Sequence, residues 1–489
     1  MTTPYFKDSQ STGSTYKTRL IAGTGLAIIV SSMIHLWLGS DIALIGVMSS
    51  VSCLGLAFLL PKRISYSNIF VFLLSVYSGL AALILKALLG QTLQTNLFAA
   101  TESAQYLFIG FTSIAACAIL AKFSLQGRVA SIGRLMNRPD FAKQALVGLI
   151  FFGVATKTLH TISISSNDDS GGATGFGGFG TFNFVILLAL SLLIKALKDS
   201  PSKFYKMLFY VTVTAITLLS IINNTKKGVF DFIFVLILSL YAFDIRLQLS
   251  KVTSGGIVLA FILLYASPTI HLMRSSFKTE TIIERVQTFY SVISEHHFSS
   301  SELSASESDF ISGFQYSYSP SGSYVYPSSA NIDRFMLILP IDQVSRKLNA
   351  SGEMGLPIFV TEMLEYVLPS FLIDKTPYSG VDLIAWRYGI RAPGNVARPV
   401  IGMIASSLAA SGVVGVLFFP FLFLLPVFMT LDYIFGDLEG NAWGLFGVAT
   451  SIFMVEREFE IMLPYLLRDI PIILIFANIC LLLAKKRKS

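Results

Sequence analysis

This sequence of 489 residues carries little charge. Only 13% of its residues are charged, about half the share of a soluble domain, while 53% are hydrophobic and the mean hydropathy is +0.68. So little charge cannot cover a water-facing surface, which excludes an ordinary soluble protein. We predict an all-α, polytopic integral membrane protein, because a bilayer forces backbone amides to pair within their own segment.

Cysteines and cofactor motifs are also scarce. The three cysteines, Cys53, Cys117 and Cys480, all lie in apolar segments, so the sequence excludes a disulfide framework and a cysteine-rich metal site. It contains no phosphate-binding glycine loop, dinucleotide fingerprint or paired-acid metal motif. We therefore expect no cofactor and no metal, and the missing fingerprints argue against a nucleotide ligand.

Long apolar segments dominate what is present. A helix that crosses a bilayer needs about 20 apolar residues, and we predict twelve crossings. They are Leu20–Leu38, Ile42–Leu60, Ile69–Leu89, Tyr106–Ala121, Ala145–Ile162, Phe182–Leu197, Met207–Ile222, Val229–Phe243, Ile257–Leu272, Val413–Leu431, Ala442–Val455 and Pro464–Leu483. The eighth and eleventh are short for a straight span.

Lysine and arginine are missing from alternate connections. Residues 40–41, 89–103 and 163–181 contain neither, whereas the connections between them are basic. This pattern predicts cytoplasmic N- and C-termini and places Met273–Arg398 outside. The net charge of +7 then reflects topology, so we predict a bilayer partner and no nucleic acid.

The predicted spans divide the chain unequally. We expect a cytoplasmic tail at 1–19, nine helices in 20–272, a large extracytoplasmic loop at 273–398, three helices in 399–484 and a cytoplasmic tail at 485–489. A chain that keeps more than a hundred residues together on one side is expected to build a site there.

The large loop is not uniform. An amphipathic helix is predicted over 274–290, and a tract rich in serine, tyrosine and glycine follows over 291–330. Residues 332–348 and 358–371 have the periodicity of short helices, separated by Gly352 and Gly355. A half-buried helix over 400–410 is expected to lead into Gly412 and Gly415.

Cations gather at two outer positions. Arg387, Arg391 and Arg398 crowd the end of the loop, and the first two share a face if 383–391 is helical. Lys226 and Lys227 join the seventh and eighth spans on the predicted outer side, against the charge rule. Either group suits a diphosphate ligand. The alternative for the arginines is ion pairing with acids of the loop. The alternatives for the lysines are that they snorkel from the membrane interface to water, or that a different span count places them inside.

These features resemble a known family. Thr225-Lys226-Lys227-Gly228 at the head of a span, a large loop after the next span, and Ser406-Ser-Leu-Ala-Ala-Ser-Gly412-Val-Val-Gly415 are similar to the Wzy-type O-antigen and capsule repeat-unit polymerases and the related O-antigen ligases. The resemblance runs from about Met207 to the C-terminus. This sequence has lysines where the family more often has an arginine at the head of the span. Lysine is a point charge and cannot bind a phosphate through two parallel hydrogen bonds, so that binding geometry does not transfer directly.

The resemblance implies a GT-C-like glycosyltransferase in the bacterial inner membrane. Its donor is a polyprenyl-diphosphate-linked oligosaccharide, and a chain-length regulator is a possible partner. The departing diphosphate needs cations, here Lys226, Lys227, Arg274, Arg387, Arg391 and Arg398.

The acceptor hydroxyl needs a general base, for which the candidates are His271, Glu362 and Glu365. His271 lies three residues before Arg274, and its alternative role is that of an interfacial histidine at a helix end. Glu362 and Glu365 lie three apart in an apolar stretch, where burial raises a carboxyl pKa; they are otherwise ordinary structural carboxylates.

Three other functions remain open at this stage. A ligase would use the same donor and transfer glycan to lipid A core. A lipid-linked oligosaccharide flippase or other carrier suits twelve spans, but it does not require the long loop, and the sequence shows no inverted repeat. The arginine cluster makes a non-catalytic assembly partner less attractive.

Overall fold

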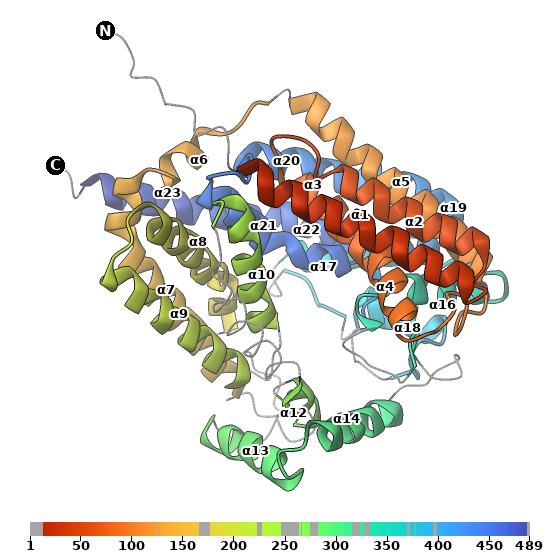
Figure 1. The fold of residues 1–489 in the computed structure, drawn as a ribbon. Helices are drawn as coiled ribbons and strands as arrows, with labels where there is room; N and C mark the ends of the chain where they lie inside the picture. Colours follow the sequence, from red (N-terminus) through yellow and green to blue (C-terminus); the bar gives the residue numbers. More distant parts are fainter. Residues whose placement is uncertain are drawn as a thin grey trace.

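The computed structural model describes residues 13–125, 127–165, 177–222, 227–245, 264–265, 267–273, 282–314, 323–326, 333–368, 372–376, 378–394 and 399–486. All regular structure within these ranges is helical, as the sequence predicts (Figure 1). The first half contains α1 (Gly13–Trp37), α2 (Ile42–Ala57), α3 (Tyr66–Ser75), η1 (Val76–Leu80), α4 (Ala81–Leu88), α5 (Ala100–Leu125), α6 (Ser131–Met136), α7 (Pro139–Ser165), η2 (Gly177–Phe182), α8 (Phe184–Asp199), α9 (Lys203–Ile222) and α10 (Lys227–Ala242).

The second half contains the loop helices and the last spans. These are α12 (Ser267–Leu272), α13 (Ile282–Glu295), α14 (Ser300–Phe314), α16 (Ile338–Ser351), α17 (Leu356–Val367), α18 (Gly380–Arg387), α19 (Gly402–Phe419), η4 (Pro420–Leu424), α20 (Leu425–Phe435), α21 (Ala442–Ser451), η5 (Ile452–Glu456), η6 (Phe459–Ile461), α22 (Met462–Pro464), η7 (Tyr465–Asp469) and α23 (Ile470–Lys486).

Seven helices in the described ranges are long and apolar enough to cross a membrane. They are Lys17–Trp37, Tyr66–Leu88, Ala100–Leu125, Pro139–Ile162, Gly180–Asp199, Gly402–Phe435 and Phe459–Ala484. Three further apolar helices are shorter, namely Ile42–Ala57, Phe230–Ala242 and Ala442–Glu456. The seventh predicted span is the helix α9, and most of the ninth lies outside the described residues. A polytopic membrane protein is therefore confirmed, and twelve crossings stay a prediction.

Helix α5 lies at the centre of the membrane core. It packs against α2, α3, α16, α19 and α20. Leu107, Phe111, Ile114 and Ala118 recur at helical spacing and are fully buried. Lipid is as apolar as these side chains, so close packing, rather than escape from water, holds such helices together. Gly110 permits that closeness, because a Cβ there would lie 2.8 Å from Ile404 of α19.

The connections predicted to face the cytoplasm meet at one end of the helices. Three backbone hydrogen bonds join them: Ala130 N–H to Tyr433 O at 2.8 Å, Leu438 N–H to Ile64 O at 2.8 Å and Gly440 N–H to Ala242 O at 2.7 Å. Buried Asp432 also accepts the Ser67 hydroxyl at 2.6 Å. The connection over residues 432–440 is acidic and contains no lysine or arginine. These hydrogen bonds hold it against the neighbouring connections at the same end of the helices.

The connections predicted to be external meet at the opposite end. Asp342 of α16 accepts the backbone N–H groups of Phe98 and Ala99 at 2.9 and 2.8 Å. Lys86, buried within a span, donates to Thr95 O at 2.5 Å and lies 3.6 Å from the centre of the Tyr324 ring. The large loop is therefore docked onto the membrane helices. Which end faces outward stays a prediction.

The loop helices only partly follow the sequence. Helices α16 and α17 confirm the two predicted short helices, and Gly352 and Gly355 separate them with φ of 68° and 83°. Helix α13 covers part of the expected amphipathic segment. Helix α14 was not expected in the serine-rich tract; the signal for it is Ser299-x-x-Glu302, where Ser299 accepts from the Glu302 N–H.

A continuous helix over 383–391, the condition for Arg387 and Arg391 to share a face, is not present. Helix α18 ends at Arg387, and Gly389 adopts φ of 68°. Both Ile390 N–H and Arg391 N–H donate to Ala385 O, at 2.7 and 3.1 Å. A left-handed glycine ends a helix in this way, so Arg387 and Arg391 do not share a helical face.

The helix α19 is broken where small residues were noted. Ser411 and Gly412 have non-helical backbone angles, with φ of 56° at Gly412. The preceding segment, predicted as half-buried, is fully buried over residues 402–410. Its end is held by Met354 N–H and Gly355 N–H, which donate to Ala409 O at 2.8 Å and Ala410 O at 3.1 Å. The break thus gives the outer loop free carbonyls on which to dock.

A π-helical turn provides a second docking point. In η1 the widened turn frees the Tyr77 carbonyl, which accepts the Leu337 N–H of the loop at 3.0 Å. Two other π-helical turns, η4 and η7, interrupt the late spans. The turn between α21 and α23 packs against α17, α19 and η4, which fixes the place where loop and spans meet.

Candidate active site

The outer turn before the last span has an alternating sequence, Glu456-Arg-Glu-Phe-Glu460. Phe459 is fully buried, and its ring lies 5.1 Å from that of Phe359 in α17, 4.7 Å from Phe419 in α19 and 5.1 Å from Phe423 in η4. These aromatic contacts join the loop to two parts of the membrane region. They fix the backbone from which the neighbouring glutamates project.

Glu456 is an ion-paired residue. Its carboxylate accepts from Arg334 Nε at 2.7 Å and Nη2 at 2.5 Å, and from the Tyr77 hydroxyl at 3.0 Å. Arg334 belongs to the loop and Tyr77 to η1, so this carboxylate bridges them. Because both partners hold the loop on η1, Glu456 has a structural role. It serves as the comparison for Glu458 and Glu460, which follow in sequence.

Glu458 and Glu460 have a different environment. They are 2% and 0% exposed. One oxygen of Glu458 and both oxygens of Glu460 find no hydrogen-bond partner among the described residues. Buried polar groups are almost always paired, so such carboxyls require an explanation beyond stability. Arginines and acids alternate in this part of the sequence, and Arg468 forms an ion pair with Asp469 at 2.7 Å, yet neither of these glutamates is ion-paired in the described structure.

Glu362 joins them to form what we call the carboxyl cluster, Glu362, Glu458 and Glu460. It lies in α17, is 7% exposed and accepts the Gly380 N–H of α18 at 2.6 Å. Gly380 is wedged between two members: a Cβ there would collide with Glu362 and lie 3.2 Å from Glu460 Oε1. The site therefore needs glycine at the start of α18, and it brings two loop helices onto the outer turn.

The electrostatics of the cluster favour protonation. Burial raises the pKa of Glu458 to about 7, Arg457 opposes the shift, and the carboxylates of Glu362 and Glu456 add to it. Like charges this close are not all ionised at neutral pH. A buried carboxyl that exchanges its proton near pH 7 suits general acid–base chemistry.

Two half-buried arginines are described in this part of the structure, one beside the carboxyl cluster and one near the end of the large loop. Arg457 is half-buried, adjacent to Glu458 in sequence, and its guanidinium lies 5.8 Å from the centre of the Phe453 ring. Arg391, a predicted diphosphate ligand, is also half-buried, just beyond α18. Both lie on the side of the structure where the loop docks.

Arg387 has a structural assignment instead. Its Nη2 donates to Ser351 O at 2.5 Å and to Glu353 O at 3.2 Å. These carbonyls end α16, where a cation offsets the negative end of the helix dipole. The exposed guanidinium is thus committed to holding two loop helices together.

Glu365, the partner predicted for Glu362, lies apart from the cluster's hydrogen bonds. Its carboxylate accepts from the N–H and the hydroxyl of Thr376 at 3.1 and 2.9 Å, in an exposed position. It closes the connection between α17 and α18. Of the two predicted carboxyls, only Glu362 is brought to the outer turn.

The remaining predicted residues have no described side chains. Lys226, Arg274 and Arg398 lie outside the described residues. Lys227 begins α10 and His271 lies in α12, but their side chains are not described. The structure therefore neither adds them to the cluster nor separates them from it.

Known proteins do not add to this picture. Neither a protein-family model, nor a curated protein, nor a solved structure matches the chain. The functional argument therefore depends on the residues themselves. In the described ranges no group of three or more histidine, cysteine, aspartate or glutamate side chains has metal-binding geometry.

Proposed function

We propose that the protein is a membrane glycosyltransferase that joins polyprenyl-diphosphate-linked oligosaccharide repeat units into a surface polysaccharide. The observation that carries this proposal is the carboxyl cluster, in which a fully buried Glu460 has no hydrogen-bond partner among the described residues, where the loop docks on the spans. We place the meeting point of water-borne sugars and a lipid carrier at this junction of loop and spans. The GT-C-like fold and the bacterial inner membrane belong to the same proposal.

The reaction needs a base and a cation. The acceptor hydroxyl oxygen attacks the anomeric carbon of the donor, a carboxylate of the cluster takes the hydroxyl proton, and the bond to the diphosphate breaks. The carrier diphosphate leaves with the electron pair. A base in a site that excludes water contributes roughly 10²–10⁴ to such a rate.

We propose that cations on the outer side stabilise the negative charge that develops on the leaving diphosphate. Arg457 and Arg391 are the described candidates, with Lys226, Lys227, Arg274 and Arg398 as further ligands expected from the sequence. Cations stabilise the leaving group more in the transition state than in the ground state. Arg387 is a weaker choice because it already binds two carbonyl groups.

A second candidate function is a proton-coupled carrier of lipid-linked oligosaccharide. The broken helix at Gly412 and the buried glutamates favour it, because carriers place discontinuous helices and unpaired carboxyls at their sites. The docked loop favours the enzyme, since alternating access requires one half of the protein to rock freely. A ligase shares the donor chemistry and differs only in its acceptor.

The deciding experiment is analysis of surface glycan and carrier lipid in a deletion strain. A polymerase is supported if single repeats remain on lipid A core while long chains disappear. Polymer retained on the carrier with bare core would instead indicate a ligase. Single repeats on carrier lipid confined to the cytoplasmic face would indicate a carrier.

A further inference from the structure

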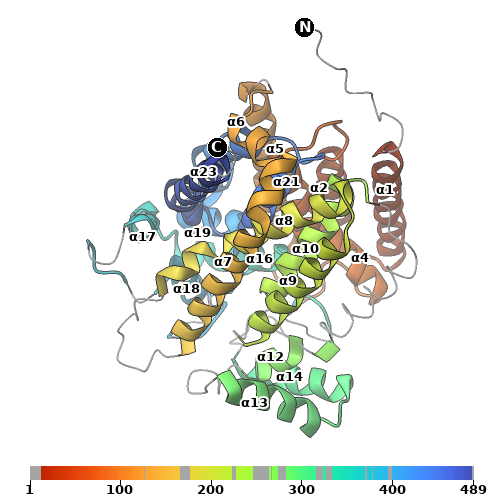
Figure 2. The same ribbon diagram turned by 90° about the vertical axis from the view of Figure 1, so that its left-hand side faces the viewer.

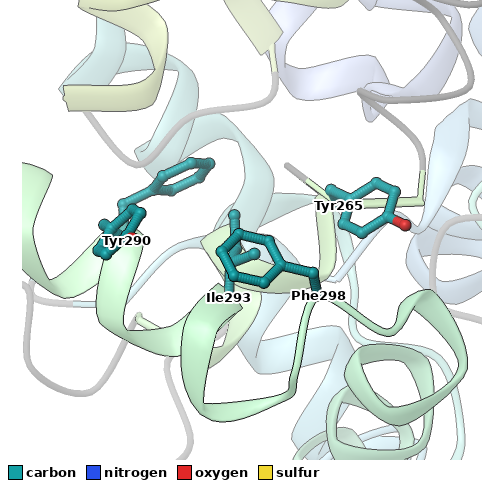
Figure 3. A pocket seen from close by; sticks show the side chains of 5 residues that line it. Tyr265, Tyr290, Ile293 and Phe298 are labelled. Atoms are coloured by element: carbon teal, nitrogen blue, oxygen red, sulfur yellow. The ribbon is translucent and has the colours of Figure 1, made fainter.

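A second site lies on the loop helices away from the carboxyl cluster. Phe289, Tyr290 and Ile293 of α13, with Phe298 after it, face Tyr265, which lies within the ninth predicted span (Figure 3). Together they line a cavity of about 490 Å³, within the range of ordinary ligand pockets. The helices α12, α13 and α14 form a separate layer beyond the end of the membrane helices (Figure 2).

The backbone beside this pocket is strained. His297 and Phe298 have φ of 51° and 55°, a left-handed conformation that is strained for bulky residues. Phe298 N–H donates to Ile293 O at 3.1 Å, which closes the end of α13. Glycine would adopt this turn without strain. The phenylalanine at this position places an aromatic ring over the pocket.

The pocket walls match a hydrocarbon. The five lining side chains have two tyrosine hydroxyls as their only polar groups, and the Tyr265 hydroxyl points away from the other rings (Figure 3). A sugar would lose its hydrogen bonds to water here without replacement. Hydrocarbon is the occupant that loses no hydrogen bonds against such walls.

The surroundings decide which lipid fits. Helices α13 and α14 together contain five carboxylates and one arginine. Glu284, Glu295, Glu302 and Asp309 are exposed. An anionic headgroup or a diphosphate would be repelled by them, whereas an ammonium headgroup would be attracted.

We propose that this pocket holds an acyl chain of a phospholipid with an ammonium headgroup, of the phosphatidylethanolamine type. The acyl chain comes from the leaflet on the loop's side of the membrane, beside the ninth predicted span that contains Tyr265. Tyr290 and Phe298 are 65% and 55% exposed without the lipid, and the chain covers both. The bound lipid anchors α13 and α14 to the bilayer surface, independently of the reaction proposed above.

The test is photolabelling of the full chain in vesicles. The probe is phosphatidylethanolamine with a diazirine on its acyl chain, and labelled peptides are mapped by mass spectrometry. We expect the 286–298 peptide to be labelled above the background of span peptides. Phe298→Gly removes the ring and relieves the turn, so labelling there should fall at least fivefold while the protein stays folded.

Two further variants make the test specific. Tyr290→Ala, at an exposed position with little risk to folding, should also reduce labelling of that peptide. Phe123→Ala is the matched control, because Phe123 is 74% exposed on α5 and far from the pocket in sequence and fold. It should leave the labelling unchanged.

Competition identifies the headgroup. Unlabelled phosphatidylethanolamine should displace the probe, and phosphatidylglycerol should not. Equal displacement by both lipids, protection by soluble oligosaccharide or by polyprenyl phosphate, or equal labelling of parent and Phe298→Gly would each overturn the proposal. Loss of labelling in Phe298→Gly with normal polysaccharide would leave the proposed enzyme untouched.

Discussion

Replacing Glu460 by glutamine should separate stability from activity. The side chain is 0% exposed and both oxygens lack partners in the described structure. Glutamine keeps the shape, removes an acid from among like charges and offers an amide to Glu362 and Glu458. Glu460→Gln should therefore be neutral or stabilising, because an unpaired buried carboxyl is costly to keep ionised. The base, however, is lost, so activity should fall roughly 10²–10⁴-fold.

Glu456→Gln is the matched control, because it changes the same residue type four positions earlier. It weakens the ion pair with Arg334 and leaves the acceptor for Tyr77. The Arg334 side chain is 55% exposed, so the loss should be only about 0.5–1 kcal/mol. Activity should remain within a few-fold of the parent, because this carboxylate holds structural partners only.

The assay combines two measurements. Thermal unfolding in detergent gives the order of stability, which we expect to be Glu460→Gln at or above the parent and Glu456→Gln below it. Complementation of the deletion strain, followed by gel analysis of glycan length, gives the activity. Normal polymer from Glu460→Gln, or a stability loss in it as large as that of Glu456→Gln, would refute the reasoning.

Other predictions test the topology, the helix break, the titration and the outer lysines. Cysteine at exposed Tyr326 should react with an impermeant thiol reagent added to intact cells, and cysteine at Ser131 should not; the reverse pattern would invert the site. Gly412→Ala should cost about 2 kcal/mol or more in unfolding experiments, because φ is 56° and the new Cβ would lie 2.5 Å from a loop carboxylate. The raised pKa of Glu458 stabilises the fold below about 4.5, and this stability is lost as pH rises to about 7, so Glu458→Gln should flatten that slope. Alanine at both Lys226 and Lys227 should abolish polymer, whereas single arginine replacements should retain it.

Much of the architecture could be read from the sequence because a bilayer imposes simple rules. Apolar length marks the helices, and lysine-free connections mark one face of the membrane. The connections around Asp432 and around Asp342 do gather at opposite ends, as that pattern predicts. The count of twelve is less secure, since a helix such as α2, Ile42–Ala57, is too short to be distinguished from a buried segment by apolarity alone.

The site was only half visible, for a physical reason. Glu362 lies in an apolar stretch, so its burial could be inferred from local periodicity. Arg457 lies beside Glu458 and Glu460 in sequence, so local sequence alone favours ion pairing for both. In the fold Arg468 forms an ion pair with Asp469, and the buried Phe459 ring packs on Phe359 and so holds the glutamates against α17. Such pairings depend on which loop docks on which turn, and local sequence does not encode that.

The arrangement of the three glutamates in Glu456-Arg-Glu-Phe-Glu460 gives the strongest reason to look for chemistry here. The first carboxylate, that of Glu456, bridges Arg334 and Tyr77. The next two are buried, and one oxygen of Glu458 and both oxygens of Glu460 have no donor in the described structure. If packing alone mattered, the later glutamates would be better as leucine or glutamine, because burying an unpaired carboxyl is costly. The cost is explained if those carboxyls take up a proton from a bound sugar hydroxyl, or carry one across the membrane. Both readings require Glu460 to exchange a proton, and neither requires it of Glu456.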